Sequence, residues 1–242
     1  MEIHGGLTNW WENEDAIKEN RKLIKQKLKD CLKANGYKQG KSSCFYLFTK
    51  DMIVYYKPEH PSIMTYLWFC FYPLYMPPVD LRVFTFGDRL SALTDNYIWN
   101  IRDYESDSSM EEWCERIAEI DRLRVSLLIP KLHDISSINE SFKEADSLGS
   151  REYVDLAGFI RLGIEKSKQI AMFTKLALHQ YDKAMLLANY ILHAGVNGEL
   201  RVNQTLSAHC KMVVDLASKH DDELTNKTMA LWREENTRII HR

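Results

Sequence analysis

The stretch from Cys44 to Tyr75 constrains the fold most, because it is the most aromatic and apolar part of the chain. Its short runs of aromatic and β-branched residues are separated by Lys50-Asp51 and by the proline-bounded turn 58–62. Runs of this length between turn residues predict strands. The short connection at Lys50-Asp51 requires antiparallel pairing, since a parallel return needs a crossover. We therefore predict a four-stranded antiparallel sheet, formed by residues 43–49, 52–57, 63–72 and 81–86.

The two faces of this sheet can be assigned because side chains alternate along a strand. In the third run, Leu67, Phe69 and Phe71 share one face. The opposite face, which we call the aromatic face, carries four amphipathic rings: Tyr46, Tyr66, Trp68 and Tyr72. Since both faces are apolar, both need a cover. Either the helices of the C-terminal half pack on the aromatic face, or its rings bind a ligand or a partner.

Helices are predicted on both sides of the sheet in the sequence. Residues 15–35 place Ile24, Leu28 and Leu32 on one helical stripe, and Gly36 is positioned as a left-handed cap. Ser109 and Glu112 have the form of a capping box, and Pro130 would end the helix that follows. The apolar stripe of this second helix is predicted to contain Trp113, Ile117, Ile120 and Leu127. Ser137 with Glu140 predicts a further short helix through Phe142 and Ala145.

After Ser150 no run resembles a strand, and the chain predicts helices alone. The first of them would begin at Val154, Ala157 and Ile160, and residues 164–178 and 182–194 form a helical hairpin. Two more helices follow around residues 206–217 and 224–232. The polar segment 147–150 is the best boundary candidate. The predicted fold is α+β, with a helix and antiparallel sheet domain in residues 1–146 and a helical bundle or cap in residues 150–242, which can pack as one unit.

Composition excludes several classes of protein. The net charge of −2 gives no global electrostatic argument for nucleic acid or for an anionic membrane. The 5 cysteines form no CxxC pair, which argues against a disulfide framework and against a structural zinc site. The apolar run 63–75 is too short to span a membrane, and Trp10 and Trp11 with acidic neighbours do not resemble a secretory signal. We expect a cytoplasmic protein.

No sequence motif indicates a catalytic, metal or cofactor site. The chain contains no GxGxxG, GxxxxGK[ST], GxSxG or HExxH pattern. The adjacent His209 and Cys210 would point about 100° apart on a helix, so they cannot share a metal ion. We therefore predict no catalytic residues, no metal and no cofactor, and the sequence favours a protein that is not an enzyme.

One resemblance extends over residues 17–145. A basic helix ends at Gly36-Tyr37, aromatic antiparallel strands follow, and another helix opens at Glu112-Trp113 after an acidic loop. This arrangement resembles a family of small bacterial domains of unknown function, some of which are associated with toxin immunity. The resemblance implies a bacterial protein with a protein partner and implies no catalytic residues.

Three functional hypotheses follow. The first is a non-enzymatic protein-interaction or immunity-type protein. The alternative is a small-molecule binder or enzyme with an aromatic pocket between sheet and helices, lined by Tyr66, Trp68 and Tyr72. A third is nucleic-acid binding through the lysine-rich helix 15–35, although Glu19 and Asp30 interrupt its positive charge.

Overall fold

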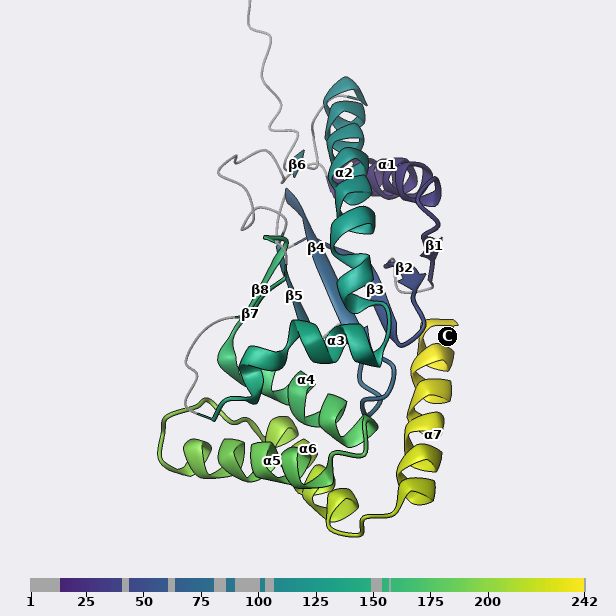
Figure 1. Cartoon of the computed structure of the whole chain (residues 1–242). Coiled ribbons are helices and arrows are strands. Elements are labelled where there is room, and N and C mark those ends of the chain that lie inside the picture. The colour runs from purple at the N-terminus through teal and green to yellow at the C-terminus, as the bar shows by residue number, and fades with distance from the viewer. Residues whose placement is uncertain are drawn as a thin grey trace, which may run out of the picture.

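The computed structural model describes residues 14–40, 44–60, 64–80, 86–89, 101–102, 107–148, 154–156 and 158–241. Trp10, Trp11 and most of the predicted fourth strand run lie outside these residues. Figure 1 shows an antiparallel sheet with helix α2 across one face and a group of helices at one end of the sheet. This arrangement confirms the predicted α+β fold, in which a helical region follows the sheet.

The sheet is antiparallel throughout, and its strands follow one another in space as β1-β2-β3-β4-β5. Strand β6 pairs with the beginning of β4. Tyr55 lies opposite Tyr46 in β2 and Cys70 in β4, so one register runs across the centre of the sheet. The bounds are β1 Lys38–Gln39, β2 Phe45–Phe48, β3 Met52–Glu59, β4 Met64–Pro73, β5 Phe86–Arg89 and β6 Ile101–Arg102.

Gly87 lies inside strand β5, directly opposite Cys70 of β4. The fourth predicted run ended at residue 86, and this bound is wrong because β5 continues to Arg89. A Cβ atom at this position would lie 2.2 Å from the carbonyl oxygen of Phe69 and 2.7 Å from the Cα of Cys70. The glycine is therefore required by the close approach of the two strands and does not mark a turn.

Helices α1 (Glu14–Lys33) and α2 (Asp107–Leu127) pack beside each other against the sheet. The predicted stripe of α1 is confirmed, because Ile24, Leu28 and Leu32 are buried. Gly36 adopts a φ of 88°, which confirms the left-handed cap. Helix α2 begins two residues before Ser109, so this serine lies in the first turn and not at the cap.

The segment after residue 150 contains a β-hairpin, contrary to the prediction of helices alone. Strands β7 (Val154–Leu156) and β8 (Ile160–Leu162) pair antiparallel. Their residues alternate between buried and exposed, with Asp155 and Arg161 exposed. Gly158 has a φ of 75°, and its amide donates to Asp155 Oδ1 over 2.6 Å. The alternation of buried and exposed residues and the glycine turn determine a hairpin, although the apolar spacing had suggested a helix.

The remaining helices follow the predictions closely. The hairpin of α4 and α5 is confirmed, with its turn at residues 178–180, and two further helices follow. Asp134, and not Ser137, caps the short helix α3, because its side chain accepts a hydrogen bond from the Ser137 amide. The bounds are α3 Ile135–Ser141, α4 Ile164–Ala177, α5 Tyr181–Val196, α6 Gln204–Ala217 and α7 Asp222–His241, with 3₁₀ turns η4 Ile129–Leu132 and η5 Lys143–Asp146.

Two buried lysines of α4 connect the segments on either side of residues 147–150. Lys168 Nζ donates to the carbonyl oxygens of Ala145 and Ser147, at 3.3 and 2.6 Å. Lys175 Nζ lies 2.5 Å from Asp146 Oδ2 and donates to Asn139 Oδ1 over 2.6 Å. Each ammonium group therefore has oxygen partners, as a buried charge requires. Among the described helices none is long and apolar enough to cross a membrane.

Candidate functional site

The four residues of the aromatic face differ in their exposure. Tyr46 and Tyr72 are buried, whereas Tyr66 and Trp68 are half-buried. The Trp68 indole N–H donates to Glu59 over 2.8 Å, and Lys57 lies 5.5 Å from the centre of its ring. The Tyr72 hydroxyl donates to the carbonyl oxygen of Pro77. Only Tyr66 and Trp68 therefore combine a place on this face with access to the surface.

A polar cluster lies between α1, α2 and the opposite face of the sheet. We call it the Asp121 cluster, and it contains Asn35, Tyr37, Tyr56, Asp121 and Arg124. Asp121 Oδ1 accepts from the hydroxyls of Tyr56 and Tyr37 at 2.7 and 3.0 Å, and Oδ2 accepts from Asn35 at 2.7 Å. The Tyr56 hydroxyl in turn accepts from Arg124 over 2.9 Å. One phenol therefore connects the carboxylate to the guanidinium.

The Asp121 cluster is closed to solvent. Asp121 is 0% exposed and Arg124 is 1% exposed. The guanidinium carbon of Arg124 lies 4.6 Å from the ring centre of Phe69 and 5.4 Å from that of Phe159. Burial raises the pKa of Asp121, although its three hydrogen-bond donors and Arg124 oppose the shift. Because no reactant can reach these groups, the cluster fixes α2 to the sheet and is not a catalytic site.

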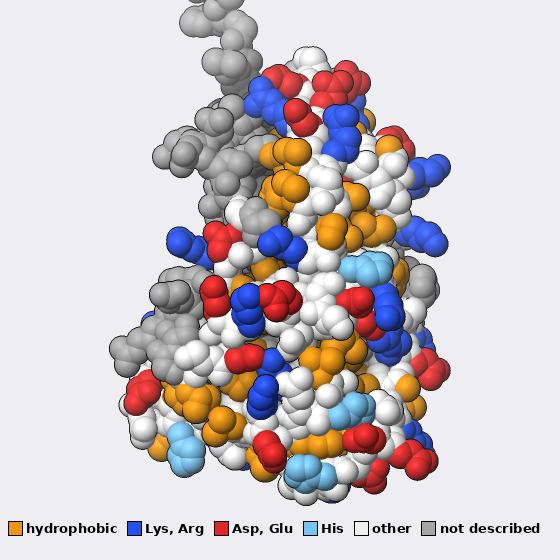
Figure 2. Space-filling model, viewed as in Figure 1, with side chains coloured by type: hydrophobic (Ala, Val, Ile, Leu, Met, Phe, Trp, Pro, Cys, Tyr) orange, Lys and Arg blue, Asp and Glu red, His pale blue; other side chains and the backbone are white. Residues whose placement is uncertain are grey.

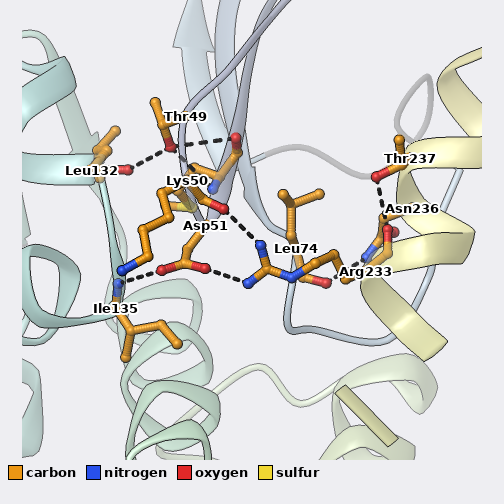
Figure 3. Close-up of polar contacts among 10 residues, drawn as sticks. Thr49, Lys50, Asp51, Leu74, Leu132, Ile135, Arg233, Asn236 and Thr237 are labelled. Carbon is orange, nitrogen blue, oxygen red and sulfur yellow. Dashed lines mark hydrogen bonds and ion pairs between the residues drawn. The ribbon is translucent and has the colours of Figure 1, made fainter. Parts of the chain in front are cut away.

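A second polar group connects the β2–β3 turn to the helices at the end of the sheet (Figure 3). Asp51 is 4% exposed, and its Oδ2 accepts from the backbone amide of Ile135 over 3.0 Å. Its Oδ1 pairs with Arg233 of α7, which also donates to the carbonyl oxygen of Lys50. One turn further along α7, the Asn236 amide donates to the carbonyl oxygens of Leu74 and Met76. These bonds hold α7 against the sheet domain.

A cleft of about 340 Å³ lies beside this group. Its lining comes from the end of β4, the start of α3, the end of α4 and one side of α7. The Tyr75 hydroxyl is not available to a ligand in the cleft, because it is hydrogen-bonded to Thr174 over 2.8 Å. The lining residues are Tyr75, Ile135, Ala177, Asn226, Met229, Ala230, Arg233 and Glu234.

The outer side of α2 exposes an apolar stripe. Leu123 and Leu127 are 50% and 53% exposed and lie one helical turn apart. Ile120 precedes them by one turn and is half-buried against the core, so it joins the stripe to the core. Figure 2 shows hydrophobic side chains gathered on the visible face over α2. We call Ile120, Leu123 and Leu127 the α2 stripe.

Charged residues border the α2 stripe on its solvent side. Arg116 lies one turn before Ile120 and forms an ion pair with Glu112. Glu119 and Arg122 continue this border and line the outer side of the helix together with Glu115. An apolar strip with a border of both charge signs has the layout of a protein-interaction surface, in which a dry centre is surrounded by a polar rim.

Sequence reasoning missed both sides of α2. The predicted stripe included Leu127, which the structure exposes, and omitted Asp121 and Arg124, which it buries. A second apolar arc formed by Ile120, Leu123 and Leu127 was visible in the sequence at three- and four-residue steps. That arc could have indicated a second apolar side of α2, but the sequence spacing alone does not show whether such a side is buried or exposed.

No group of three or more metal-ligating side chains comes together within the described residues. Comparisons with protein-family models, with curated proteins and with solved structures found no match for this chain. The functional argument therefore depends on the surfaces and contacts of the molecule itself.

Proposed function

We propose that this chain is a non-enzymatic protein-interaction protein that binds a protein partner through the α2 stripe. The observation that carries the proposal is the exposure of Leu123 and Leu127, one turn apart on a helix whose other side is fixed to the core. Isolated exposed leucines are normal on soluble proteins, but adjacent ones next to a half-buried isoleucine form a continuous apolar surface.

The two exposed leucines can supply part of the free energy that a specific contact needs. Complete burial of a leucine side chain contributes about 1.5–3 kcal/mol. Since about half of each leucine is already covered, a partner would gain roughly 1 kcal/mol from each. The α2 backbone is already ordered by the Asp121 cluster, so binding has little conformational entropy to oppose it.

The layout of the stripe fits an amphipathic helix of the partner. Three apolar residues spaced along one helix present a narrow ridge, which matches the i, i+3, i+4 anchors of helix-mediated recognition. The border contains Arg122 together with Glu115 and Glu119, so it would favour partner residues of both charge signs beside the apolar strip. The resemblance to bacterial immunity domains supports the same class of function, and we extend the proposal to a bacterial, cytoplasmic setting.

Site-specific photocrosslinking tests the proposal. A photoreactive amino acid replaces Leu127 in one variant and Leu231 of α7 in another, which is 58% exposed and serves as the matched control. In a lysate of the native host we expect one discrete protein adduct from position 127 and none from position 231. The substitution Leu123→Glu should reduce the adduct at position 127 at least tenfold.

Equal capture from both positions would contradict the proposal, as would an adduct that Leu123→Glu leaves unchanged. An adduct between two copies of this chain would place the stripe in a homodimer and would also reject a foreign partner. Thermal unfolding of each variant shows whether a lost adduct reflects a lost fold.

The cleft beside Asp51 favours a second candidate function, namely small-molecule binding. Its volume of about 340 Å³ falls within the range of ligand pockets, and it combines Tyr75 and Met229 with the charged Arg233. Filling it with Ala230→Trp should remove any small molecule that co-purifies with the protein in native mass spectrometry. A chain that carries no such molecule after purification from its host would reject this candidate.

A further inference from the structure

Two cysteines face each other between α1 and α2. Lys27 Nζ of α1 lies 2.9 Å from Glu111 of α2, and Asn35, in the turn after α1, donates to Asp121 of α2 over 2.7 Å. Cys31 lies one turn from both Lys27 and Asn35, and Cys114 lies between the two contact points on α2. One ion pair and one hydrogen bond therefore hold α1 and α2 together on either side of the two cysteines.

The two thiols are hydrogen-bonded and differ in character. Cys31 is half-buried, whereas Cys114 is 2% exposed. The hydrogen bond with Cys114 lowers the pKa of Cys31 and outweighs burial and the two nearby carboxylates, which act in the opposite direction. That same hydrogen bond, together with burial, raises the pKa of Cys114. Cys31 is therefore the more accessible thiol and the one with the lowered pKa, and Cys114 is its protected neighbour.

We propose that Cys31 and Cys114 form a modification site, a dithiol that hydrogen peroxide oxidises to a disulfide joining α1 to α2. The argument is independent of the α2 stripe and goes beyond the proposed interaction function. Two neighbouring thiols, one half-buried and one enclosed, have the arrangement of an attacked cysteine and a resolving cysteine.

The chemistry balances in two steps. The Cys31 thiolate sulfur attacks one oxygen of hydrogen peroxide, the O–O bond breaks, and the leaving hydroxide takes a proton to become water. Cys31 is then a sulfenic acid. The Cys114 sulfur attacks the Cys31 sulfur, the S–O bond breaks, and the departing hydroxide takes the Cys114 proton to give a second water. Two thiols are oxidised by two electrons and one peroxide is reduced.

The other three cysteines should not react. Cys44, Cys70 and Cys210 are at most 1% exposed. Burial raises the pKa of Cys70 to about 12 and that of Cys210 to about 12. Cys70 and Cys210 are therefore protonated at neutral pH, and all three thiols are closed to solvent, which makes them internal controls in the same molecule.

Peptide mapping of the folded chain tests the proposal. After brief exposure of the folded chain to hydrogen peroxide, the chain is denatured, free thiols are alkylated, and the product is digested with trypsin without reduction. Cys31 then falls in residues 30–33 and Cys114 in residues 103–116. We expect these two peptides to be linked, with a mass lower by two hydrogens than their sum, while Cys70 and Cys210 remain alkylated.

Two variants test the order of the steps. Cys114→Ser should accumulate a dimedone-reactive sulfenic acid at Cys31, because the resolving thiol is absent. Cys31→Ser should leave Cys114 unlabelled, because this thiol is enclosed. The proposal is overturned if the folded wild type keeps both thiols free, if Cys31 links to a second copy of itself, or if Cys70 or Cys210 oxidises as fast as Cys31. The wild-type map decides the question even where a variant fails to fold.

Discussion

The two sides of α2 reverse the usual placement of charge and apolar surface. Asp121 and Arg124 are 0% and 1% exposed on the inner side, whereas Leu123 and Leu127 are 50% and 53% exposed on the outer side. Transfer free energies favour the opposite arrangement. On the inner side Asp121 accepts three hydrogen bonds and Arg124 donates to Tyr56, although the Arg124 Nε has no partner among the described residues. The outer side has no such compensation among the described residues, and this difference is the basis of the proposed partner surface.

The largest expected effect comes from removing the acceptor at the centre of the inner side. In Asp121→Ala, the hydroxyls of Tyr37 and Tyr56 and the amide of Asn35 lose their shared acceptor, and Arg124 stays buried without a counter-charge. Breaking a buried charged network typically costs about 3–5 kcal/mol of unfolding free energy. Urea unfolding followed by circular dichroism measures the loss.

The matched control for this substitution is Glu119→Ala, which removes a carboxylate from the same helix at an exposed position. We expect it to change the unfolding free energy by no more than about 0.5 kcal/mol. If the two substitutions cost the same, the inner network contributes nothing special and the comparison between the two sides of α2 fails.

Arg233→Ala tests whether the same rule holds away from α2. The substitution removes the side-chain partner of the buried Asp51 carboxylate, which keeps only its bond from the Ile135 amide. Because the Arg233 side chain is 40% exposed, we expect a moderate loss of about 1–2 kcal/mol.

Arg238→Ala is the control in the same helix, since Arg238 forms only an exposed pair with Glu235. Its expected change in unfolding free energy is below about 0.5 kcal/mol. A loss from Arg238→Ala as large as that from Arg233→Ala would mean that burial of the partner carboxylate does not decide the cost. Both values come from the same urea titration.

The sheet and most helices were predictable from sequence because local pattern determines them. Turn residues separate the aromatic strands, and the left-handed Gly36 ends α1 as expected. The sides of α2 were not predictable, because burial of Asp121 depends on Tyr37 and Tyr56, which are more than sixty residues away. Periodicity finds a helix, but partners distant in the sequence decide which side of it faces the core.

The candidate sites show the same limit. The aromatic face was predicted as a set of four rings, and strand alternation does place them together. Their unequal exposure follows from what packs on each ring, which the sequence does not state. The Asp51 and Arg233 pair joins residues 182 positions apart, so no local signal could identify it.

The pH dependence of stability sharpens the account of the inner side. Burial raises the pKa of Asp121 in the folded chain. The stability it contributes is therefore full below the unfolded pKa of about 3.9 and is lost as pH rises through the folded pKa. The Asp121→Asn variant has no titrating group at this position. Its unfolding free energy should therefore increase relative to that of the wild type as pH rises through that window. Urea titrations of both proteins at several pH values measure this difference. A difference that stays constant or falls with pH would contradict the direction assigned to the Asp121 pKa.

The smallest effect on stability is expected on the outer side of α2. In Leu123→Gln with Leu127→Gln, helix propensity is nearly unchanged and little buried area is lost, so the unfolding free energy should shift by no more than about 0.5 kcal/mol per site. The same double variant should nevertheless abolish the photocrosslink from a neighbouring position, Ser126, which is also exposed. Leu231→Gln, on α7, should change neither quantity.

If the double variant destabilises the chain by several kcal/mol, the leucines are structural, and their exposure does not indicate a partner. A stable fold that loses only the partner would separate the two sides of α2 by function: the inner side holds the helix in place, and the outer side uses that rigidity to bind.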